Sequence, residues 1–443
     1  MEKRIEQAAE RLAQAVRFPT VSHFSLDEMD LDVFSSFLSF LEKTYPLLHQ
    51  KLERTLINGY SPVYRWPGKD SSRQPILFLA HYDVVPALEE GWTHEGPFSG
   101  VIADGRVWGR GSIDDKSSVI GLMETFELLL EEGFQPPRDL WLALGFDEEV
   151  NGRHGAQKIV SWFEEKGICF ECVLDEGGAV SDGSMIGIKE PVAVIGLAEK
   201  ASASYEFVFT GEEGHSSTPP AHTSLGYMAE FIYKAERHPM PARLTETVEK
   251  MLKSIAPYMP GIQGWILKKP RFFFPLLKGI LLKNKQTAAL LRSTFAFTMS
   301  SSGSAPNVLP KEAVCTANLR VLQGETTADV LQHLEKTTGV PCQVRPIAVE
   351  EPSRAASVDS AAYSHLVGVI GRVFPDAVVI PYLMAGGTDS RYYEDLADNV
   401  YRFQPLRLSE AELALMHGTD EHLAIDKLGK MMSFYRELIV TLN

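Results

Sequence analysis

The sequence predicts an α/β fold with a mostly parallel central sheet flanked by helices, and a second, inserted α+β domain. The first part follows from short apolar runs, at 75–85, 139–149 and 171–178, that alternate with longer segments of helical periodicity. Such alternation is typical of βαβ units, whose parallel strands are buried on both faces. The second part follows from a change to the order β-α-β-β-α-β within residues 199–350, which is the order of the split-βαβ, ferredoxin-like sandwich.

The elements of the first domain, residues 1–198 and 351–443, follow from local patterns. Helical spacing of apolar residues predicts helices over 2–17, 30–49, 114–133, 154–167, 359–374 and 426–442. Buried strands are predicted over 75–85, 139–149, 171–178 and 377–391, with a tight hairpin at 101–111.

In the inserted domain, residues 240–292 do not fit a compact sandwich. This segment contains PRFFFPLLKGILLKN, in which large apolar residues stand beside lysines. Local packing over the inserted domain is the favoured interpretation. A surface that touches a membrane or binds an acyl chain is the alternative.

Size and charge restrict the classes of partner. A chain of 443 residues exceeds one ordinary core, so two or three domains are expected. The apolar fraction of 44% and the charged fraction of 23% are those of a soluble globular protein. The net charge of −15 argues against nucleic acid or an anionic membrane as a partner. It does not constrain a small substrate, because a metal site can reverse the local field.

The N-terminal residues and the cysteines predict where in the cell the protein is found. Residues 1–22 have helical spacing and lack the apolar core of a secretion signal. No segment reaches the roughly 18 apolar residues of a membrane span. The four cysteines lack the spacing of a zinc finger, and reduced thiols are the favoured interpretation. We therefore expect a cytoplasmic protein without an integral membrane segment.

Acidic and imidazole side chains follow three predicted strands. His81 and Asp83 close the first, Glu148 and Glu149 the second, and Asp175 the third, while Asp114 opens a helix. The carboxyl ends of strands in an open α/β sheet form the ligand-binding edge. So many converging carboxylates would repel one another unless cations held them. Imidazole with carboxylate suits zinc, and less selectively cobalt or manganese.

Nine short motifs between residue 80 and residue 421 carry a resemblance to a known family: AHYDVVP, GWTHEGPFSG, VWGRGSIDDK, GFDEEVNG, VLDEGG, GEEGHSSTPP, APNVLP, GGTDSR and HGTDE. In these motifs the chain resembles the co-catalytic dizinc metallopeptidases, a family that includes aminoacylase, carboxypeptidase S and succinyl-diaminopimelate desuccinylase. The resemblance is strongest to the branch of carboxypeptidase S and the N-acyl-amino-acid synthase/hydrolases.

The resemblance implies two Zn²⁺ ions, with Co²⁺ or Mn²⁺ as substitutes. The implied ligands are His81, Asp114, Glu149, Asp175 and His417. Asp114, rather than Asp115, would bridge the two ions. His417 fits the family pattern H-x-x-[ND]-E, whereas His422 does not.

The resemblance also implies roles around the metals. Asp83 would orient His81 through a hydrogen bond. Glu148 would be the general base that takes a proton from water and returns it to the leaving nitrogen. His215 would stabilise the oxyanion in the partner subunit's active site across a homodimer.

Three further residues are expected to contact substrate. Asn307 would bind substrate or the oxyanion, and Arg391 would clamp the substrate α-carboxylate with its planar guanidinium. Gly386 would allow the backbone to approach the ligand. For Asn307 and Arg391, a purely structural role is the alternative.

These expectations describe a hydrolase that cleaves the amide bond of small N-acyl amino acids or short peptides with a free carboxylate. The inserted domain would dimerise and close over the site as a lid. A dipeptidase would use the same machinery, and the run FFFPLLKGILL makes a fatty-acyl substrate attractive. A catalytically inactive binding protein on this fold is the alternative of another class. The presence of every implied ligand and of the base argues against it.

Overall fold

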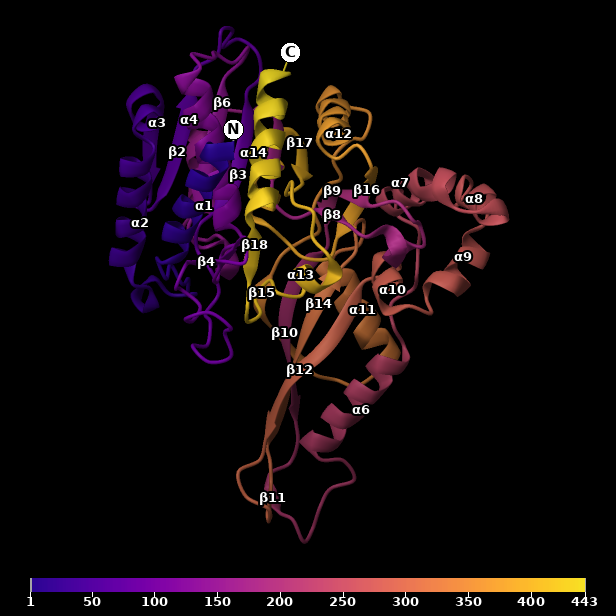
Figure 1. Cartoon of the computed structure of the whole chain (residues 1–443). Coiled ribbons are helices and arrows are strands. Elements are labelled where there is room, and N and C mark those ends of the chain that lie inside the picture. The colour runs from indigo at the N-terminus through magenta and orange to yellow at the C-terminus, as the bar shows by residue number, and fades with distance from the viewer. Residues whose placement is uncertain (1, 443) are drawn as a thin grey trace. The chain divides into compact units, whose positions relative to one another are not determined.

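The computed structural model describes residues 2–442, which divide into two compact units (Figure 1). Unit 1 contains the described residues up to Leu197, then Ala355–Tyr382, then those from Thr388 onward. Unit 2 contains Ala198–Arg354 and Leu383–Gly387. The sequence prediction placed 199–350 in the inserted domain, whereas unit 2 also contains residues 198, 351–354 and 383–387.

Unit 1 is built on a nine-stranded sheet. Its strands, in spatial order, are β1 (Glu53–Ile57), β2 (Ser61–Trp66), β6 (Leu140–Gly145), β3 (Ile76–His81), β7 (Phe170–Asp175), β17 (Ala397–Arg402), β9 (Val192–Glu199) and β16 (Val378–Met384), with β8 (Val180–Ser181) paired to β9. The central strands β6, β3, β7 and β17 are parallel, while β1, β2 and β9 pair antiparallel to their neighbours. The predicted mostly parallel sheet is therefore confirmed at its centre.

Helices cover both faces of this sheet because its central strands are apolar on both. Phe78 of β3 packs in a core that includes residues of α1 (Glu2–Val16), α4 (Lys116–Glu131), α12 (Ala361–Val373) and α14 (Ile425–Val440). Its neighbours Leu77 and Leu79 point to the opposite core, which includes α5 (Ala156–Lys166). Adjacent residues on opposite faces follow from the two-residue repeat of a strand.

Several predicted elements have other bounds in the structure, and the strand expected over 377–391 is the shorter β16 (Val378–Met384). The helix expected over 30–49 is two helices, α2 (Leu31–Thr44) and α3 (Pro46–Lys51). Pro46 lacks the N–H that a continuous helix requires, and it disfavours helical backbone at Tyr45. The helix expected from Asp114 begins at Lys116 and ends at Glu131, two residues before Gly133, whose φ is 68°.

A small three-stranded sheet joins two parts of unit 1 that are far apart in the sequence. The predicted hairpin is present as β4 (Val101–Ala103) and β5 (Arg106–Trp108). The sequence analysis did not foresee that β18 (His422–Ala424) pairs with β5, with His422 opposite Trp108. This pairing anchors the chain at residues 422–424, a few residues after His417.

Unit 2 has the strand and helix order predicted from the sequence. It contains β10 (Ala201–Thr210), α6 (Ser224–Arg237), β12 (Thr294–Ser302), β14 (Glu312–Val321), α11 (Thr327–Thr338) and β15 (Gln343–Val349). The strands form an antiparallel sheet in the order β12-β14-β10-β15. Phe207 and Leu319 of the sheet share a core with Phe231 of α6 and Leu334 of α11.

Shorter elements complete the chain. Unit 2 also contains the ribbon of β11 (Gly214–His215) and β13 (Val308–Leu309), and the helices α7 (Glu246–Ile255), α8 (Gly261–Leu267), α9 (Phe274–Leu281) and α10 (Lys285–Leu291). Short helical turns occur at η1 (Leu26–Glu28), η2 (Glu148–Val150), η3 (Gly183–Ile186), η4 (Ala256–Tyr258), η5 (Asp389–Tyr393) and α13 (Glu410–Leu413). Within residues 2–442, no helix combines the length and apolar composition that crossing a bilayer demands.

Candidate metal centre

The carboxyl ends of three adjacent strands carry the titratable residues of the site. His81 is the last residue of β3, Glu148 and Glu149 follow β6, and Glu176 follows β7. Because β6, β3 and β7 are parallel neighbours, these side chains emerge at one edge of the sheet. All of them belong to unit 1.

Asp114 stands between two imidazoles. Its Oδ1 lies 3.1 Å from Nε2 of His81, and its Oδ2 lies 3.1 Å from Nε2 of His417. Nε2 of His417 is also 3.1 Å from Oε1 of Glu149. The two oxygens of one carboxylate therefore face two separate donor groups, which is the arrangement of a bridging ligand.

Two further carboxylate oxygens lie near the same nitrogen of His81. Oε2 of Glu148 is 3.9 Å, and Oε1 of Glu176 is 3.8 Å, from Nε2 of His81. His81, Asp114 and Glu149 have ligand atoms within 4.8 Å of one another, and so do His81, Glu148 and Glu176. These donors, one imidazole nitrogen with carboxylate oxygens in each set, suit divalent ions.

The geometry does not support the predicted ligand Asp175. One of its oxygens accepts the backbone N–H of Ser390 at 2.9 Å, and the other accepts its neighbour Glu176's N–H at 2.9 Å. Glu176, one residue further, points to His81 instead. Sequence reasoning missed Glu176, although it stands in the same VLDEGG motif, because the end of β7 does not reveal which way the following turn aims its side chains.

Asp83 holds both the histidine and the loop after β6. Its Oδ1 is 3.2 Å from Nδ1 of His81 and accepts the N–H of Glu148 at 3.1 Å, while its Oδ2 accepts the N–H of Glu149 at 3.1 Å. The Asp83 side chain is fully buried. The placement agrees with the predicted orienting role toward His81 and adds a contact to the loop of the expected base.

Asp115 faces away from the imidazole nitrogens. Its Oδ1 accepts a hydrogen bond from the side-chain amide of Gln404 at 2.9 Å, and its Oδ2 lies 3.4 Å from the backbone N of His81. The peptide bond between Asp114 and Asp115 is cis. These contacts agree with Asp114, rather than Asp115, as the bridging residue.

The residues after His417 explain the HGTDE motif. Glu421 is fully buried, pairs with Arg110 at 2.5 Å and accepts the N–H of Ile113 at 2.8 Å. Asp420 accepts the N–H of Thr93, in GWTHEGPFSG, at 2.7 Å. His417 itself has φ 61°, a left-handed conformation that non-glycine residues rarely adopt. The contacts of Asp420 and Glu421 hold this loop, while the imidazole of His417 contacts Asp114.

Burial and mutual repulsion shift the pKa values of the cluster. Burial raises the pKa of Glu149, and it raises the pKa values of Glu148 and Glu176 well above their usual range. Burial alone would also raise the pKa of Asp114, but hydrogen bonds with His417 and His81 lower it. Cations would relieve the cost of ionising such closely spaced acids, so the donor set fits a pair of metal ions.

A further buried acid lies beneath the cluster. Asp389 of η5 is 5% exposed, and its Oδ1 has no hydrogen-bond partner among residues 2–442. Burial, together with the charges of Asp147 and Asp175, raises the pKa of Asp389 well above its usual range. Sequence reasoning singled out Arg391 and Gly386 in this stretch but not Asp389. Its position two residues before Arg391, in GGTDSR, was the available signal.

The predicted substrate-contacting residues fall in both units. In unit 2, His215 and Asn307 line one hollow, and Ser216 donates its N–H to the Asn307 carbonyl at 3.1 Å. Gly386 is also in unit 2 and is exposed, and no atom lies within 4 Å of a Cβ built there. In unit 1, the Arg391 guanidinium lies 4.8 Å from the Tyr392 ring centroid. The roles of these four residues stay predictions.

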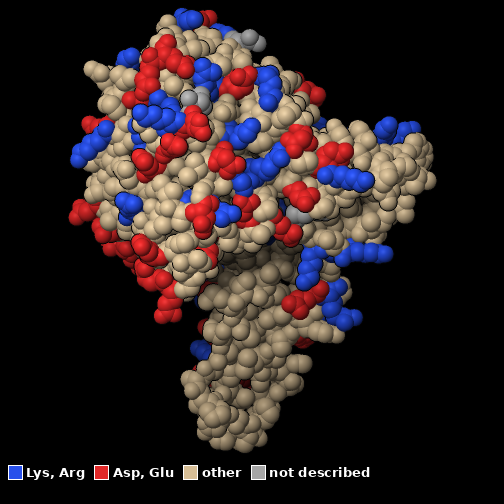
Figure 2. All heavy atoms as spheres, viewed as in Figure 1, with Lys and Arg blue, Asp and Glu red and all other residues tan. Residues whose placement is uncertain are grey.

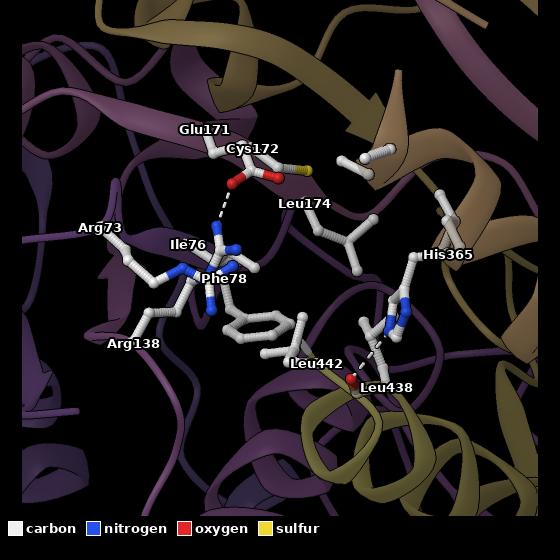
Figure 3. Close-up of a pocket in the computed structure, with 13 residues that line it drawn as sticks. Arg73, Ile76, Phe78, Arg138, Glu171, Cys172, Leu174, His365, Leu438 and Leu442 are labelled. Atoms are coloured by element: carbon white, nitrogen blue, oxygen red, sulfur yellow. Dashed lines mark hydrogen bonds and ion pairs between the residues drawn. The ribbon is translucent and has the colours of Figure 1, made fainter. Parts of the chain in front are cut away.

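Unit 1 also has a cavity near the amino ends of β3 and β7, whereas the cluster described above lies at their carboxyl ends. The cavity has a volume of about 160 Å³ and lies near Ile76, which begins β3, between the sheet and the helices α12 and α14. Figure 3 shows Phe78, Leu174 and Leu438 on its wall, with the Arg138–Glu171 ion pair at one end. Burial raises the pKa of the Cys172 thiol at its wall, which makes that sulfur a poor nucleophile. The cluster at the strand ends is therefore the candidate site.

Comparisons with known proteins agree with this geometry. The sequence profile of peptidase family M20/M25/M40 matches residues 77–441. Probable carboxypeptidase S-like 2 of Dictyostelium discoideum is 36% identical over 440 residues, which cover 98% of this chain and 84% of that protein. The N-fatty-acyl-amino acid synthase/hydrolase PM20D1 of Xenopus tropicalis is 34% identical over 443 residues, which cover 99% and 86%. The M20 family metallo-carboxypeptidase Sso-CP2 of Sulfolobus solfataricus shares the fold, with a TM-score of 0.71 at 18% identity over 98% of both chains.

Proposed function

This chain belongs to peptidase family M20/M25/M40 and is a metal-dependent hydrolase, and we propose that it cleaves the amide bond of small N-acyl amino acids or short peptides that carry a free carboxylate. The names of its relatives, carboxypeptidase S-like and N-fatty-acyl-amino acid synthase/hydrolase, support both substrate types. The observation that carries the proposal is the placement of the two Asp114 oxygens against His81 and His417.

The ligand set that we propose has two halves. His81 and Glu176 would hold one ion, His417 and Glu149 the other, and Asp114 would bridge them. Zinc suits this set, and cobalt or manganese could substitute. When bound, such an ion pair polarises a substrate carbonyl and lowers the pKa of water.

Glu148 is the proposed general base. Its carboxylate lies beside the cluster, and the Asp83 carboxylate holds its backbone N–H. It would take the proton of the attacking water and return it to the departing nitrogen, as the amide bond breaks. The neighbouring Glu149 contacts His417 instead, so the two adjacent glutamates divide the roles of base and ligand.

His215 is the proposed oxyanion donor. Its Nδ1 accepts the backbone N–H of Ser217 at 3.1 Å. In the neutral imidazole this leaves the proton on Nε2, which can then donate to a developing negative charge. Arg391, stacked on Tyr392, is the proposed clamp for the substrate carboxylate, and Asn307 is a further proposed contact.

We also propose that unit 2 forms a homodimer and acts as a lid. Strand β12 is an edge of the four-stranded sheet, and it contains neither a charged residue nor proline between Thr294 and Ser302. Edges without such protection readily pair with another strand. Ser300→Lys on this edge should convert dimer to monomer in analytical ultracentrifugation, whereas Gln343→Lys on the opposite edge strand β15 should not. The cytoplasmic location stays a prediction.

One assay tests the proposed activity. The release of free amine should be measured from a panel of N-acyl amino acids and dipeptides, with zinc, cobalt or manganese supplied. Glu148→Gln should lower kcat by about 10²–10⁴-fold while retaining both metal ions. Glu165→Gln, on the last turns of α5, serves as the control and should leave turnover unchanged. Unchanged turnover in Glu148→Gln would refute the assigned base, and no turnover of any substrate by the wild type would favour an inactive binding protein.

A further inference from the structure

The segment from Tyr258 to Lys285 of unit 2, termed the arm, exposes large apolar side chains. It contains α8 and α9, and its exposed large apolar or aromatic residues are Tyr258 at 44%, Ile262 at 71%, Trp265 at 53%, Phe272 at 78%, Leu276 at 52% and Ile280 at 56%. Single exposed apolar residues are normal on a soluble protein, whereas a gathered set marks an interaction surface.

The exposed residues form one patch rather than scattered positions. Ile262 and Trp265 are three residues apart on α8, and Leu276 and Ile280 are four apart on α9, so each pair shares a helix face. Phe273 joins the two helices, because its ring centroid lies 4.9 Å from that of Trp265 and 4.8 Å from that of Phe272.

Packing of the arm onto unit 2 does not use this patch. Leu267 of α8 and Leu277 of α9 are buried at 7% and 6% exposure, so the inner faces of both helices supply the internal contacts. The favoured sequence interpretation, local packing of residues 240–292, accounts for these inner residues. The outer apolar residues stay exposed, although Trp265 and Phe272 each contact Phe273.

The arm's own charged residues have a single sign. No Asp or Glu occurs between Glu249 and Glu312, although the chain as a whole has a net charge of −15. The arm's own charged residues are Lys268, Lys269, Arg271, Lys278, Lys283 and Lys285. Arg271 pairs with Glu249, whereas the five lysines form no ion pair within the described residues. Figure 2 shows the region of α8 and α9 mostly tan, with blue and red side chains at its margins.

We propose that the arm docks on an anionic phospholipid surface, with the patch inserted among the lipid chains and the lysines on the headgroups. Helices with an apolar face, a purely basic polar face and a tryptophan at the boundary lie in the plane of such an interface. Lysine stems can rest along the apolar layer while their ammonium groups reach the phosphates. A protein partner is less well matched, because lysine is depleted in protein–protein interfaces.

Because the arm is basic and the rest of the chain is acidic, the arm is the part expected to face an anionic membrane. The acidic remainder of the chain is repelled by an anionic surface, while the arm is attracted to it. The net charge therefore does not exclude an anionic membrane as a partner once the basic residues are gathered on one segment.

Sedimentation with vesicles tests the proposal on the full-length protein. One vesicle is phosphatidylcholine alone, and the other is an equimolar mixture of phosphatidylcholine and phosphatidylglycerol. Wild type should partition at least about tenfold more strongly onto the anionic vesicle, and added salt should weaken that binding. The combined variant Trp265→Ser/Phe272→Ser/Ile280→Ser should lose about tenfold or more of it. Its matched control is Phe24→Ser/Leu88→Ser, which removes equally exposed apolar residues of unit 1 and should bind as wild type.

A pair of charge-reversal variants separates the contribution of the lysines from that of the apolar patch. Lys268→Glu/Lys269→Glu should abolish the preference for the anionic vesicle, whereas Lys43→Glu/Lys51→Glu, on exposed lysines of unit 1, should retain it. Thermal unfolding of each variant, together with its turnover of a water-soluble dipeptide, checks that the protein is folded. Equal vesicle binding by wild type and the combined serine variant would overturn the proposal. So would a change from dimer to monomer in that variant without lipid, because the patch would then join two copies of the chain.

Discussion

The carboxylate of Asp83 accepts the backbone N–H of Glu148 at 3.1 Å. The same carboxylate contacts Nδ1 of His81 at 3.2 Å and the N–H of Glu149 at 3.1 Å. One buried acid therefore contacts His81 and the loop after β6, and so helps to position the proposed base and one proposed ligand of each ion. Asp83 in the H-x-D pattern at the end of β3 thus contacts His81 and also hydrogen-bonds the loop that follows the neighbouring strand β6.

Asp83→Asn should weaken the metal centre without removing a ligand. The amide has one acceptor oxygen in place of two, so one of the N–H groups of Glu148 and Glu149 loses its partner. We expect metal affinity to fall by about 10–100-fold, measured by competition with a chelator. Asp139→Asn provides the control, because Asp139 is also a buried acid beside a strand but binds Gly68 and Ser71, away from the cluster. Unchanged metal affinity in Asp83→Asn would contradict the orienting role.

Asp175 and its neighbour Glu176 can be told apart by metal content. Glu176→Gln should reduce the bound metal from two ions per chain toward one, as measured by elemental analysis of the purified protein. Asp175→Asn should keep both ions but destabilise the fold by about 1–3 kcal/mol, because Asp175 accepts the buried N–H of Ser390. The reverse pattern would return Asp175 to the ligand set.

Gly178 of the VLDEGG motif should tolerate no side chain. A Cβ at this position would lie 1.9 Å from the carbonyl oxygen of Val194 and 2.9 Å from that of Arg402, both of which are backbone atoms. Gly178→Ala should therefore lower the free energy of unfolding by about 1–3 kcal/mol or more. Gly371→Ala is the matched control. Gly371 lies inside α12 with no atom within 4 Å of an added Cβ, so alanine should stabilise by about 0.5–1 kcal/mol. Equal effects of the two substitutions would contradict the close approach at Gly178.

Lys200 should make the stability of unit 2 depend on pH. Burial lowers the pKa of its ammonium from 10.5 to about 8, although Nζ donates to the carbonyls of Ala289 and Arg292 at 3.0 Å each. Between these two pKa values the unfolded chain binds more protons than the folded one, so stability rises with pH. Wild type should gain about 2 kcal/mol over Lys200→Met between about pH 7.5 and about pH 9.5 in urea unfolding. A difference that stays constant across this interval would show that the ammonium is not desolvated.

Residue patterns predicted most of the arrangement of the fold. Alternating apolar strands and helices indicated the parallel centre of the sheet, and the residues at strand ends indicated where chemistry would gather. His81, Asp114, Glu149 and His417 do converge in the structure. Such patterns succeed because strand periodicity and chain topology bring the ends of parallel strands to the same edge, whatever the details of packing.

The sequence by itself determined which residue types stand at the ligand-binding edge and that they suit divalent ions. Only the tertiary structure decided that Glu176 rather than Asp175 points to His81, and that Glu421 and Asp420 hold the His417 loop. It also decided which apolar residues of the arm are buried and which face outward. The physical reason is the same in each case: the direction of a side chain after a strand, or its exposure on a short helix, depends on hydrogen bonds and contacts made by residues far away in the chain.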